Sequence, residues 1–381
     1  MMRVNVLGAG PAGLYAAILL KRLKPDIALR VFEQNPPNAT FGFGVVFSDT
    51  ALDFLRADDA ETADLIEPAM KRWTDIVINH KGERIAIDGI GFAGIGRLEL
   101  INLLQKRASE LGIAVEYNKR IDNLDSLPTA DLVIGADGLN SLVRGSDPGA
   151  FGEKIEDLNN RFVWYGADRE FDALTQSFIE TDVGPMNAHH YAYAPGRATF
   201  IVELDAKTFN RSGFADMDEP DYRAACERYF ADQLDGASLI ANNSHWRRFP
   251  NLSCATWYAH NRVLVGDALH TAHFSIGSGT RLALEDVIAL VRVLREADWN
   301  VGTALPAYQA ARQPVLEKIV SAANTSARWY EDYAKHMELE PWNFALSYIR
   351  RAGRLDASRL RRMAPVFSGN LEAQGIDLEA A

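Results

Sequence analysis

Apolar positions open the chain as short runs separated by turns. Residues 4–7 form a short run with two valines, residues 14–20 form a longer apolar run after a glycine turn, and a third run covers 29–32. This order predicts a strand, a helix and a second strand. Similar runs that end in a turn return at 131–138 and 262–267. We therefore expect a buried parallel sheet built from segments far apart in the sequence.

Between these runs the periodicity changes. Alternating apolar and polar residues over 73–91 predict a hairpin, and the amphipathic stretch 97–111 predicts a helix. Residues 41–47 have the composition of a glycine-rich apolar loop, and a helix is expected to follow over 49–55. Aromatic-rich segments predict a second, antiparallel sheet. Its strands are expected at 161–166, 177–180, 189–193 and 198–203, and further helices at 280–295 and through much of 303–364.

Three glycines occupy the first predicted turn. Gly8, Gly10 and Gly13 lie between strand and helix, with Pro11 and Ala12 at the start of the helix. Glycines there permit a tight turn, the close approach of a pyrophosphate and close helix–strand packing, while the helix N-terminus supplies free N–H groups. The alternative is a purely structural glycine turn. The pattern predicts a dinucleotide site.

An acidic residue stands in register with this turn. Glu33 ends the second strand twenty residues after Gly13, where a carboxylate can accept the hydroxyl groups of an adenosine ribose. We place Gln34, its neighbour, at the same site. Strand, glycine turn, helix and acid together favour dinucleotide binding over a structural turn.

These elements predict an α/β fold: a Rossmann-type domain with an inserted mixed or antiparallel substrate sheet and C-terminal helices. The nucleotide-binding domain is expected to be discontinuous, because phosphate-type turns are missing between about 160 and 250. We assign residues 1–70, 92–158 and 251–300 to it, 71–91 and 159–250 to the substrate domain, and 301–381 to a helical region.

Composition and charge narrow the partners. The chain has 381 residues, 48% hydrophobic and 24% charged, and its net charge is −11. This charge argues against binding of nucleic acid or an anionic membrane surface. The two cysteines follow no metal-ligand spacing, and we find neither a signal peptide nor an apolar run of about 18 residues. We expect a cytoplasmic monomer or homodimer.

Two further motifs make the pattern specific. Asp137 to Arg144 reads D-G-x-x-S-x-x-R, and Gly266-Asp267 is followed by Gly279 and an acidic pair at 285–286. Together with the glycine turn and Arg97, these segments resemble the para-hydroxybenzoate hydroxylase-like group of single-component FAD-dependent aromatic monooxygenases. The resemblance implies a resident FAD, with NADH or NADPH and O₂ as co-substrates. It also implies hydroxylation of an electron-rich aromatic ring through a flavin C4a-hydroperoxide.

Two longer segments resemble one branch of this group. They are residues 42–49 and 270–280, and they are similar to the branch of salicylyl-CoA 5-hydroxylase and 2-aminobenzoyl-CoA monooxygenase. This resemblance implies that the substrate is an aromatic acyl-CoA thioester. A free aromatic or indole substrate, as in violacein synthesis, is the nearest alternative. A non-oxygenating flavin reductase or an FAD-binding regulatory protein is the alternative of a different class.

The cofactor residues follow from the motifs. We expect Asp267 to bond a ribityl hydroxyl, with an N-cap aspartate as the alternative. Arg97 is expected to neutralise pyrophosphate charge, unless it is a solvated arginine at a helix start. Asp137 and Arg144 are expected either to pair structurally or to contact the cofactor. The predicted cofactor set is Gly8, Gly10, Pro11, Ala12, Gly13, Glu33, Gln34, Arg97, Asp137, Gly266, Asp267, Gly277, Gly279 and Thr280, with the N–H groups of Gly277 and Gly279 directed at the flavin.

Substrate contacts are expected from aromatic and histidine side chains. An apolar cavity must orient the ring and exclude water. His273 is the first candidate to accept a ring proton or orient a thioester carbonyl, because its loop after the Gly-Asp pair is tied to the flavin; His190 is the second. A packing or backbone-bonding role is the alternative for His273. No histidine has metal-ligand spacing, and no metal is expected. The predicted cavity wall is Phe43, Val45, Phe47, Trp164, Tyr165, Tyr191 and Phe274, with ordinary core packing as the alternative for each.

Overall fold

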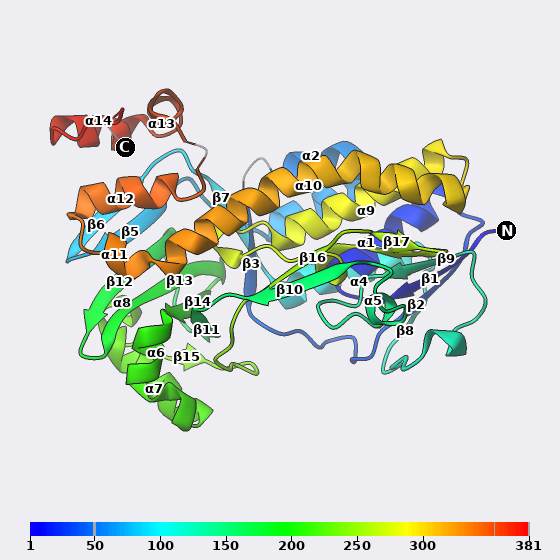
Figure 1. Ribbon diagram of the computed structural model, residues 1–381, viewed down its shortest axis with the longest axis horizontal. Helices are drawn as coiled ribbons and strands as arrows, with labels where there is room; N and C mark the ends of the chain where they lie inside the picture. Colours follow the sequence, from blue (N-terminus) through cyan, green and yellow to red (C-terminus); the bar gives the residue numbers. More distant parts are fainter. Residues whose placement is uncertain (49–50, 354, 380–381) are drawn as a thin grey trace.

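The computed structural model describes residues 1–48, 51–353 and 355–379. Two main sheets lie toward opposite ends of an elongated molecule, and the long helix α10 (Val301–Glu331) runs along one side (Figure 1). The N-terminus lies at the end formed by the first sheet, and the C-terminus near the other end. The α/β fold expected from the sequence is confirmed.

The first sheet is the predicted parallel sheet. Its six strands have the order β17-β18-β9-β1-β2-β8, and only the edge strand β17 runs antiparallel. Val4, Val6 and Ile134 are fully buried, as expected in a parallel sheet covered by helices. The pairing of β9 with β18 joins the two halves of the chain beside the glycine turn. The strands are β1 (Arg3–Leu7), β2 (Ala28–Phe32), β8 (Val115–Glu116), β9 (Leu132–Gly135), β17 (Tyr258–Ala259) and β18 (Arg262–Leu264).

Helices pack tightly around this sheet. Helix α1 (Pro11–Leu23) contacts both α4 (Arg97–Glu110) and α9 (Gly279–Glu296), so segments from three distant parts of the sequence form one core. Helix α9 also packs along α10. Shorter helices on this side are α2 (Ala51–Asp58), α3 (Ala60–Ile66) and α5 (Leu142–Gly145).

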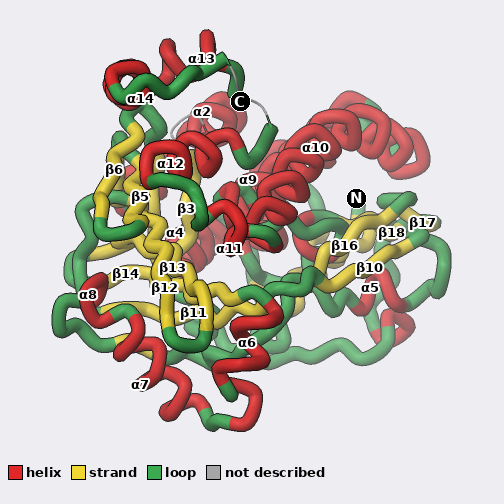
Figure 2. Tube along the Cα trace, turned by 60° about the vertical axis from the view of Figure 1, so that its left-hand side comes forward, coloured by secondary structure: helices red, strands yellow, loops and turns green. Residues whose placement is uncertain are grey.

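The second sheet has seven strands in the order β15-β11-β14-β13-β12-β5-β6. All its neighbours pair antiparallel except β5 and β12, which run parallel, and the predicted hairpin over 73–91 is the pair β5 and β6. In Figure 2 these strands stand side by side, with α6 and α7 below them. The strands are β5 (Ile76–His80), β6 (Glu83–Ile87), β11 (Arg161–Ala167), β12 (Leu174–Thr181), β13 (Gly184–Ala194), β14 (Arg197–Leu204) and β15 (Leu239–Ile240).

Two small sheets lie between the main ones. The segment 41–47 is not wholly a loop, because β3 (Gly44–Ser48) pairs with β7 (Phe92–Gly96), which also pairs with β4 (Lys71–Trp73). The glycines of this segment favoured a loop in the prediction, although its second half forms a strand. The antiparallel pair β10 (Glu153–Asp157) and β16 (Pro250–Cys254) forms the second small sheet. The helix expected from residue 49 is described from Ala51 onward, since Asp49 lies outside the described residues.

The remaining helices cover the second sheet. They include α6 (Ala206–Ser212), α7 (Glu219–Tyr229) and α8 (Ala231–Leu234) on one side, and α11 (Tyr333–His336), α12 (Pro341–Arg350), α13 (Ala357–Met363) and α14 (Pro365–Ala373) toward the C-terminus. Aromatic residues of α10 and α12 pack on Phe178 of β12. Within the described residues we find no helix with the length and apolar surface needed to span a bilayer.

Candidate functional site

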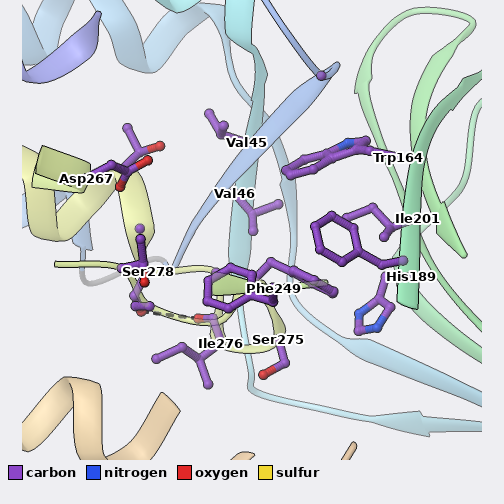
Figure 3. Close-up of a pocket in the computed structure, with 18 of the residues that line it drawn as sticks. Val45, Val46, Trp164, His189, Ile201, Phe249, Asp267, Ser275, Ile276 and Ser278 are labelled. Atoms are coloured by element: carbon purple, nitrogen blue, oxygen red, sulfur yellow. Dashed lines mark hydrogen bonds between the residues drawn. The ribbon is translucent and has the colours of Figure 1, made fainter. Parts of the chain in front are cut away.

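A cavity of about 930 Å³ lies between the two main sheets. Its lining includes the start of α1, the turn at Asp267 and the loop 271–280 on one side, and strands of the second sheet on the other. Figure 3 shows Asp267 across the cavity from Trp164 and Ile201, with Val45 and Val46 on β3 between them. The cavity therefore has a polar end near the parallel sheet and an apolar end near the second sheet.

The glycine turn has the geometry that its sequence predicts. Gly8 has φ +93°, and a Cβ there would collide with the carbonyl oxygen of Ala136; one at Gly13 would collide with the carbonyl oxygen of Gly8. Gly10, by contrast, has open space where a Cβ would stand. Gly10, Pro11 and Ala12 line the cavity, and no side chain caps the N-terminus of α1. Free N–H groups at this helix end can bind an anion.

Glu33 is held beside this turn. Its carboxylate accepts the N–H of Ala9 at 2.8 Å, and the backbone and side-chain N–H groups of Asn35 at 2.8 and 2.9 Å. A carboxylate has about four acceptor positions, so it retains capacity for a ligand hydroxyl. Gln34 is exposed next to it, and neither residue lines the main cavity.

Asp267 provides an unpaired carboxylate at the polar end of the cavity. It lies deep in the molecule with its side chain open to the cavity, and it makes no hydrogen bond with another described residue. Burial raises its pKa, and the positive charge of Arg97 opposes that shift. Arg97 also lines the cavity, and burial lowers its pKa. The two side chains offer an acceptor and a cation to one ligand.

A buried ion-pair network supports the turn at Asp267. Asp286 accepts the N–H of Gly266 at 3.1 Å, contacts Nε2 of His270 at 2.7 Å and accepts Nε of Arg312 at 2.9 Å. Burial alone would raise the pKa of Asp286, but His270 and Arg312 bring it below its usual range. Arg312 also pairs with Glu285 at 2.8 Å. The sequence did not predict a role for Arg312, because this residue lies in a long helix without a recognisable motif.

The loop before α9 differs in one detail from expectation. Gly277 has φ +61° and lines the cavity, but its N–H donates to the carbonyl of Phe274 at 3.0 Å. This N–H is therefore not available to a flavin, contrary to the prediction. Gly279 and Thr280 begin α9, where the first N–H groups have no partner within the helix, and both line the cavity.

Asp137 and Arg144 do not pair with each other. Asp137 accepts the N–H groups of Leu142 and Val143 at 2.7 and 3.3 Å, while its Oδ1 is buried without a partner in the described chain. Arg144 instead pairs with Glu153 and donates to the carbonyl of Ala268 at 2.7 Å. The expected structural pair is therefore wrong: Arg144 ties the Asp267 turn to β10, and Asp137 braces α5.

Four of the seven predicted wall residues line the cavity: Val45, Trp164, Tyr191 and Phe274. The other three do not. Phe47 is buried in the core around the first sheet, Tyr165 is buried on the face of β11 that packs under α7, and Phe43 lies against Gly166. Strand alternation separates Trp164 from Tyr165. Further apolar wall residues that we did not predict include Val46, Ile76, Phe92, Phe162, Leu174, Ile201, Phe249 and Ile276.

The histidine at the wall is His189. Neither His190 nor His273 lines the cavity, so the prediction that these two histidines reach the substrate is wrong. His190 points to the opposite face of β13, where it contacts Ser177 at 2.9 Å and stacks on Phe200. His273 lies behind Phe274 and accepts the N–H of Ser275 at 3.4 Å, so it shapes the loop.

His189 belongs to a buried polar pair. Its Nε2 lies 3.3 Å from Oε2 of Glu203, whose Oε1 accepts Nδ2 of Asn160 at 2.8 Å. Burial, followed by the charge of Arg351, lowers the pKa of His189 to about 3, and burial raises the pKa of Glu203. His189 is thus a neutral ring at neutral pH, and its Nδ1 forms no hydrogen bond with the described chain.

Two further polar residues line the apolar end of the cavity and were not predicted from the sequence. Gln176 lines the cavity and accepts the hydroxyl of Tyr330 at 3.1 Å. Arg351, at the end of α12, lines it as well and donates to the carbonyl of Ser275 at 2.8 Å. Only the alternation along β12 hinted at Gln176, and no local signal marked Arg351.

The polar end of the cavity fits a flavin dinucleotide. Two helix N-termini, those of α1 and α9, border it, and Gly10 and Gly279 leave space for close approach. Asp267 and Arg97 add an unbonded carboxylate and a cation. These features match a pyrophosphate, ribityl hydroxyls and a ring edge that becomes negative on reduction.

Comparison with known proteins agrees with this fit. A family model described as FAD binding domain matches residues 1–323. The chain is 38% identical over 361 residues to a salicyloyl-CoA 5-hydroxylase of Streptomyces sp, covering 92% of this chain and 70% of that protein. It is 36% identical over 329 residues to a 3-hydroxy-4-methyl-anthranilyl-(aryl-carrier protein) 5-monooxygenase of Streptosporangium sibiricum, covering 86% and 89%.

Among solved structures, 2-methyl-3-hydroxypyridine-5-carboxylic acid oxygenase superposes with a TM-score of 0.72 over 97% of this chain and 98% of that one. The two sequences are 19% identical, so this match shows a shared fold.

Proposed function

Because the chain belongs to the FAD-binding-domain family of FAD-dependent aromatic monooxygenases, we propose that it hydroxylates an aromatic acyl-CoA thioester. Support for the thioester comes from the names of two relatives, which act on a salicyloyl group on CoA and on an anthranilyl group on an aryl-carrier protein. In both, an aromatic acid is carried in bound form. We place a similar ring in the apolar end of the cavity.

The observation that carries this proposal is the two-part cavity. Its polar end is bordered by Gly10, Asp267 and Arg97, and its apolar end is walled by Trp164 and Phe274. A single space of this size can hold a flavin and an aromatic ring next to each other. The apolar wall excludes water from the place where oxygen is transferred.

The cofactor residues are assigned by position. Gly10, Pro11 and Ala12 would hold the pyrophosphate, Glu33 the adenosine ribose, and Asp267 the ribityl chain. When bound, FAD supplies the reductive activation of O₂ that the side chains of this protein cannot provide.

The chain itself contributes a hydrogen-bond acceptor for a polar group on the ring. His189 is neutral at neutral pH, so its Nδ1 can accept a hydrogen bond from a ring hydroxyl or amino group. Glu203, 3.3 Å from Nε2, fixes the tautomer that leaves Nδ1 as the acceptor. A hydrogen bond from that hydroxyl or amino group to Nδ1 polarises the group and makes the ring more electron-rich at the carbon that receives oxygen.

A substrate panel tests the proposal. Salicyloyl-CoA, 2-aminobenzoyl-CoA, their free acids and indole are each supplied to the FAD-loaded protein with NADH or NADPH, while oxygen uptake and products are measured. The proposal predicts coupled hydroxylation with one or both thioesters. Turnover of only the free acids or indole would contradict the thioester, and substrate-independent oxidation without a hydroxylated product would favour a reductase.

A further inference from the structure

Three arginines gather at one rim of the cavity. Arg161 stands at the start of β11, and Arg247 and Arg248 precede β16; all three line the cavity. The backbones of Phe162 and Arg247 exchange two hydrogen bonds, of 2.9 and 3.0 Å, so the two segments are held together. Arg247 and Arg248 are exposed to solvent. The cluster therefore lies where the cavity opens.

None of these arginines forms an ion pair within 4 Å with any residue that the structure describes. Asp157 lies on the same rim and interacts with Arg161 only at longer range. Arg161 donates to the carbonyl of Asn159 at 2.7 Å, and the guanidinium of Arg247 lies 5.5 Å from the ring centre of Phe162. The cluster keeps most of its donors free.

Like charges face one another at this rim. Burial and then Arg248 lower the pKa of Arg161, and burial and then Arg97 lower that of Arg247. The whole chain has a net charge of −11, and several of its exposed arginines pair with carboxylates. An unpaired basic cluster in such a protein is an electrostatic site for an anion.

We propose that Arg161, Arg247 and Arg248 bind phosphate groups of the nucleotide part of a CoA thioester whose acyl group enters the cavity. This rests on the proposed function, because it assigns the outer end of the same substrate. Guanidinium groups suit phosphate because their forked N–H donors match its oxygens. Phe162 and Phe249, next to these arginines in sequence, also line the cavity and lead inward from the rim.

A nicotinamide nucleotide carries the same chemistry, so the experiment must separate the two. Arg247→Gln, Arg248→Gln and the double variant are compared with Arg228→Gln, a matched control at an exposed arginine of α7 outside the cavity lining. The KM for salicyloyl-CoA, the KM for NADH and NADPH, and inhibition by CoA and dephospho-CoA are measured for each. Thermal unfolding checks that each variant is folded.

The proposal predicts that the KM for the thioester rises about tenfold in a single variant and further in the double variant. The inhibition constant of CoA rises in parallel, both effects weaken at high salt, and Arg228→Gln behaves as wild type. A larger rise in the nicotinamide KM than in the thioester KM would overturn the proposal and assign the cluster to the reductant.

Failure of the rim assignment can be distinguished from failure of the proposed function. If the wild type turns over the thioester but the double variant keeps its KM and its CoA inhibition, the rim assignment is wrong and the proposed function stands. If the wild type neither turns over the thioester nor binds CoA, both fail. Should Arg247→Gln unfold, Arg248→Gln and Arg248→Glu supply the same comparison at a second exposed position.

Discussion

Nε2 of His189 lies 3.3 Å from Oε2 of the buried Glu203, and His189 joins Gln176 and Arg351 as a polar residue of the mainly apolar cavity wall. The neighbouring His190 points to the other side of the same strand. Two adjacent histidines, with pKa values both lowered to about 3 by burial, thus have different environments and permit a matched comparison.

Replacing His189 should affect hydroxylation rather than cofactor binding. For His189→Gln we expect kcat to fall about tenfold, since one well-placed hydrogen bond contributes on this scale. More reduced flavin should then be lost to peroxide. Flavin absorbance, oxygen uptake and product formation measure the three quantities. His190→Gln is the control, and wild-type coupling in His189→Gln would remove this residue from the chemistry.

The pH dependence of stability should report on His190. Its folded pKa of about 3 lies below the unfolded value of about 6.5, so the unfolded state binds more protons between those values. This group therefore reduces the free energy of unfolding as the pH falls below about 6.5. In His190→Gln the loss should be smaller, by up to about 1.4 kcal/mol per pH unit. Urea unfolding at pH 7 and pH 5.5 tests this. An equal change in the free energy of unfolding between these pH values for wild type and variant would refute it.

Asp267 should determine FAD affinity. Its carboxylate is open to the cavity and is unbonded within the described structure, so Asp267→Ala removes a ligand contact without breaking an internal hydrogen bond. We expect FAD to bind about tenfold or more weakly, with little change in the stability of the apoprotein. Titration of apoprotein with FAD measures this, with the exposed Asp232→Ala as control. Full FAD occupancy at low FAD concentration would count against the assignment.

Two glycine substitutions should separate folding from cofactor binding. Gly10 has φ −70° and free space around its missing Cβ, so Gly10→Ala should fold yet obstruct the pyrophosphate. Gly13→Ala collides with the backbone at Gly8, and it should lower the melting temperature of the apoprotein. Calorimetry and FAD titration on both variants check the pair. Normal FAD affinity in Gly10→Ala would place the cofactor elsewhere.

Arg312 should be a stability residue. Arg312→Gln leaves Asp286 and Glu285 without their buried cation, and losing one partner of such a pair costs about 3–5 kcal/mol. Denaturant unfolding measures the loss, with exposed Arg228→Gln as the control. A change below about 1 kcal/mol would show that His270, paired with Asp286, and Arg281, paired with Glu285, sustain the network.

The sequence predicted the strands, helices and cofactor motifs of the first sheet more reliably than the residues that line the cavity. The strand, glycine turn and helix around Gly8 and Gly13 are encoded locally, because backbone collisions forbid larger residues there. Asp267 was found because its motif follows a buried strand. By contrast, β3 was taken for a loop because its glycines hid the strand pattern, and its pairing with β7 spans distant segments.

The choice among histidines depended on information that the sequence lacks. Strand alternation placed His189 and His190 on opposite faces, but only the tertiary structure decides which face meets the cavity. Proximity to the Gly-Asp motif favoured His273, yet its ring turns back to cap Ser275. Arg351 and Glu203 reach the site from remote elements and carry no local signature.

The most direct test of aromatic acyl-CoA hydroxylation is product analysis with salicyloyl-CoA, FAD, NADH or NADPH and isotopically heavy O₂. We predict a hydroxylated thioester that carries one heavy oxygen atom, formed in step with reductant oxidation, and with a lower KM than free salicylate. An unlabelled product, or turnover of the free acid alone, would contradict the central claim that this cavity hydroxylates an aromatic acyl-CoA.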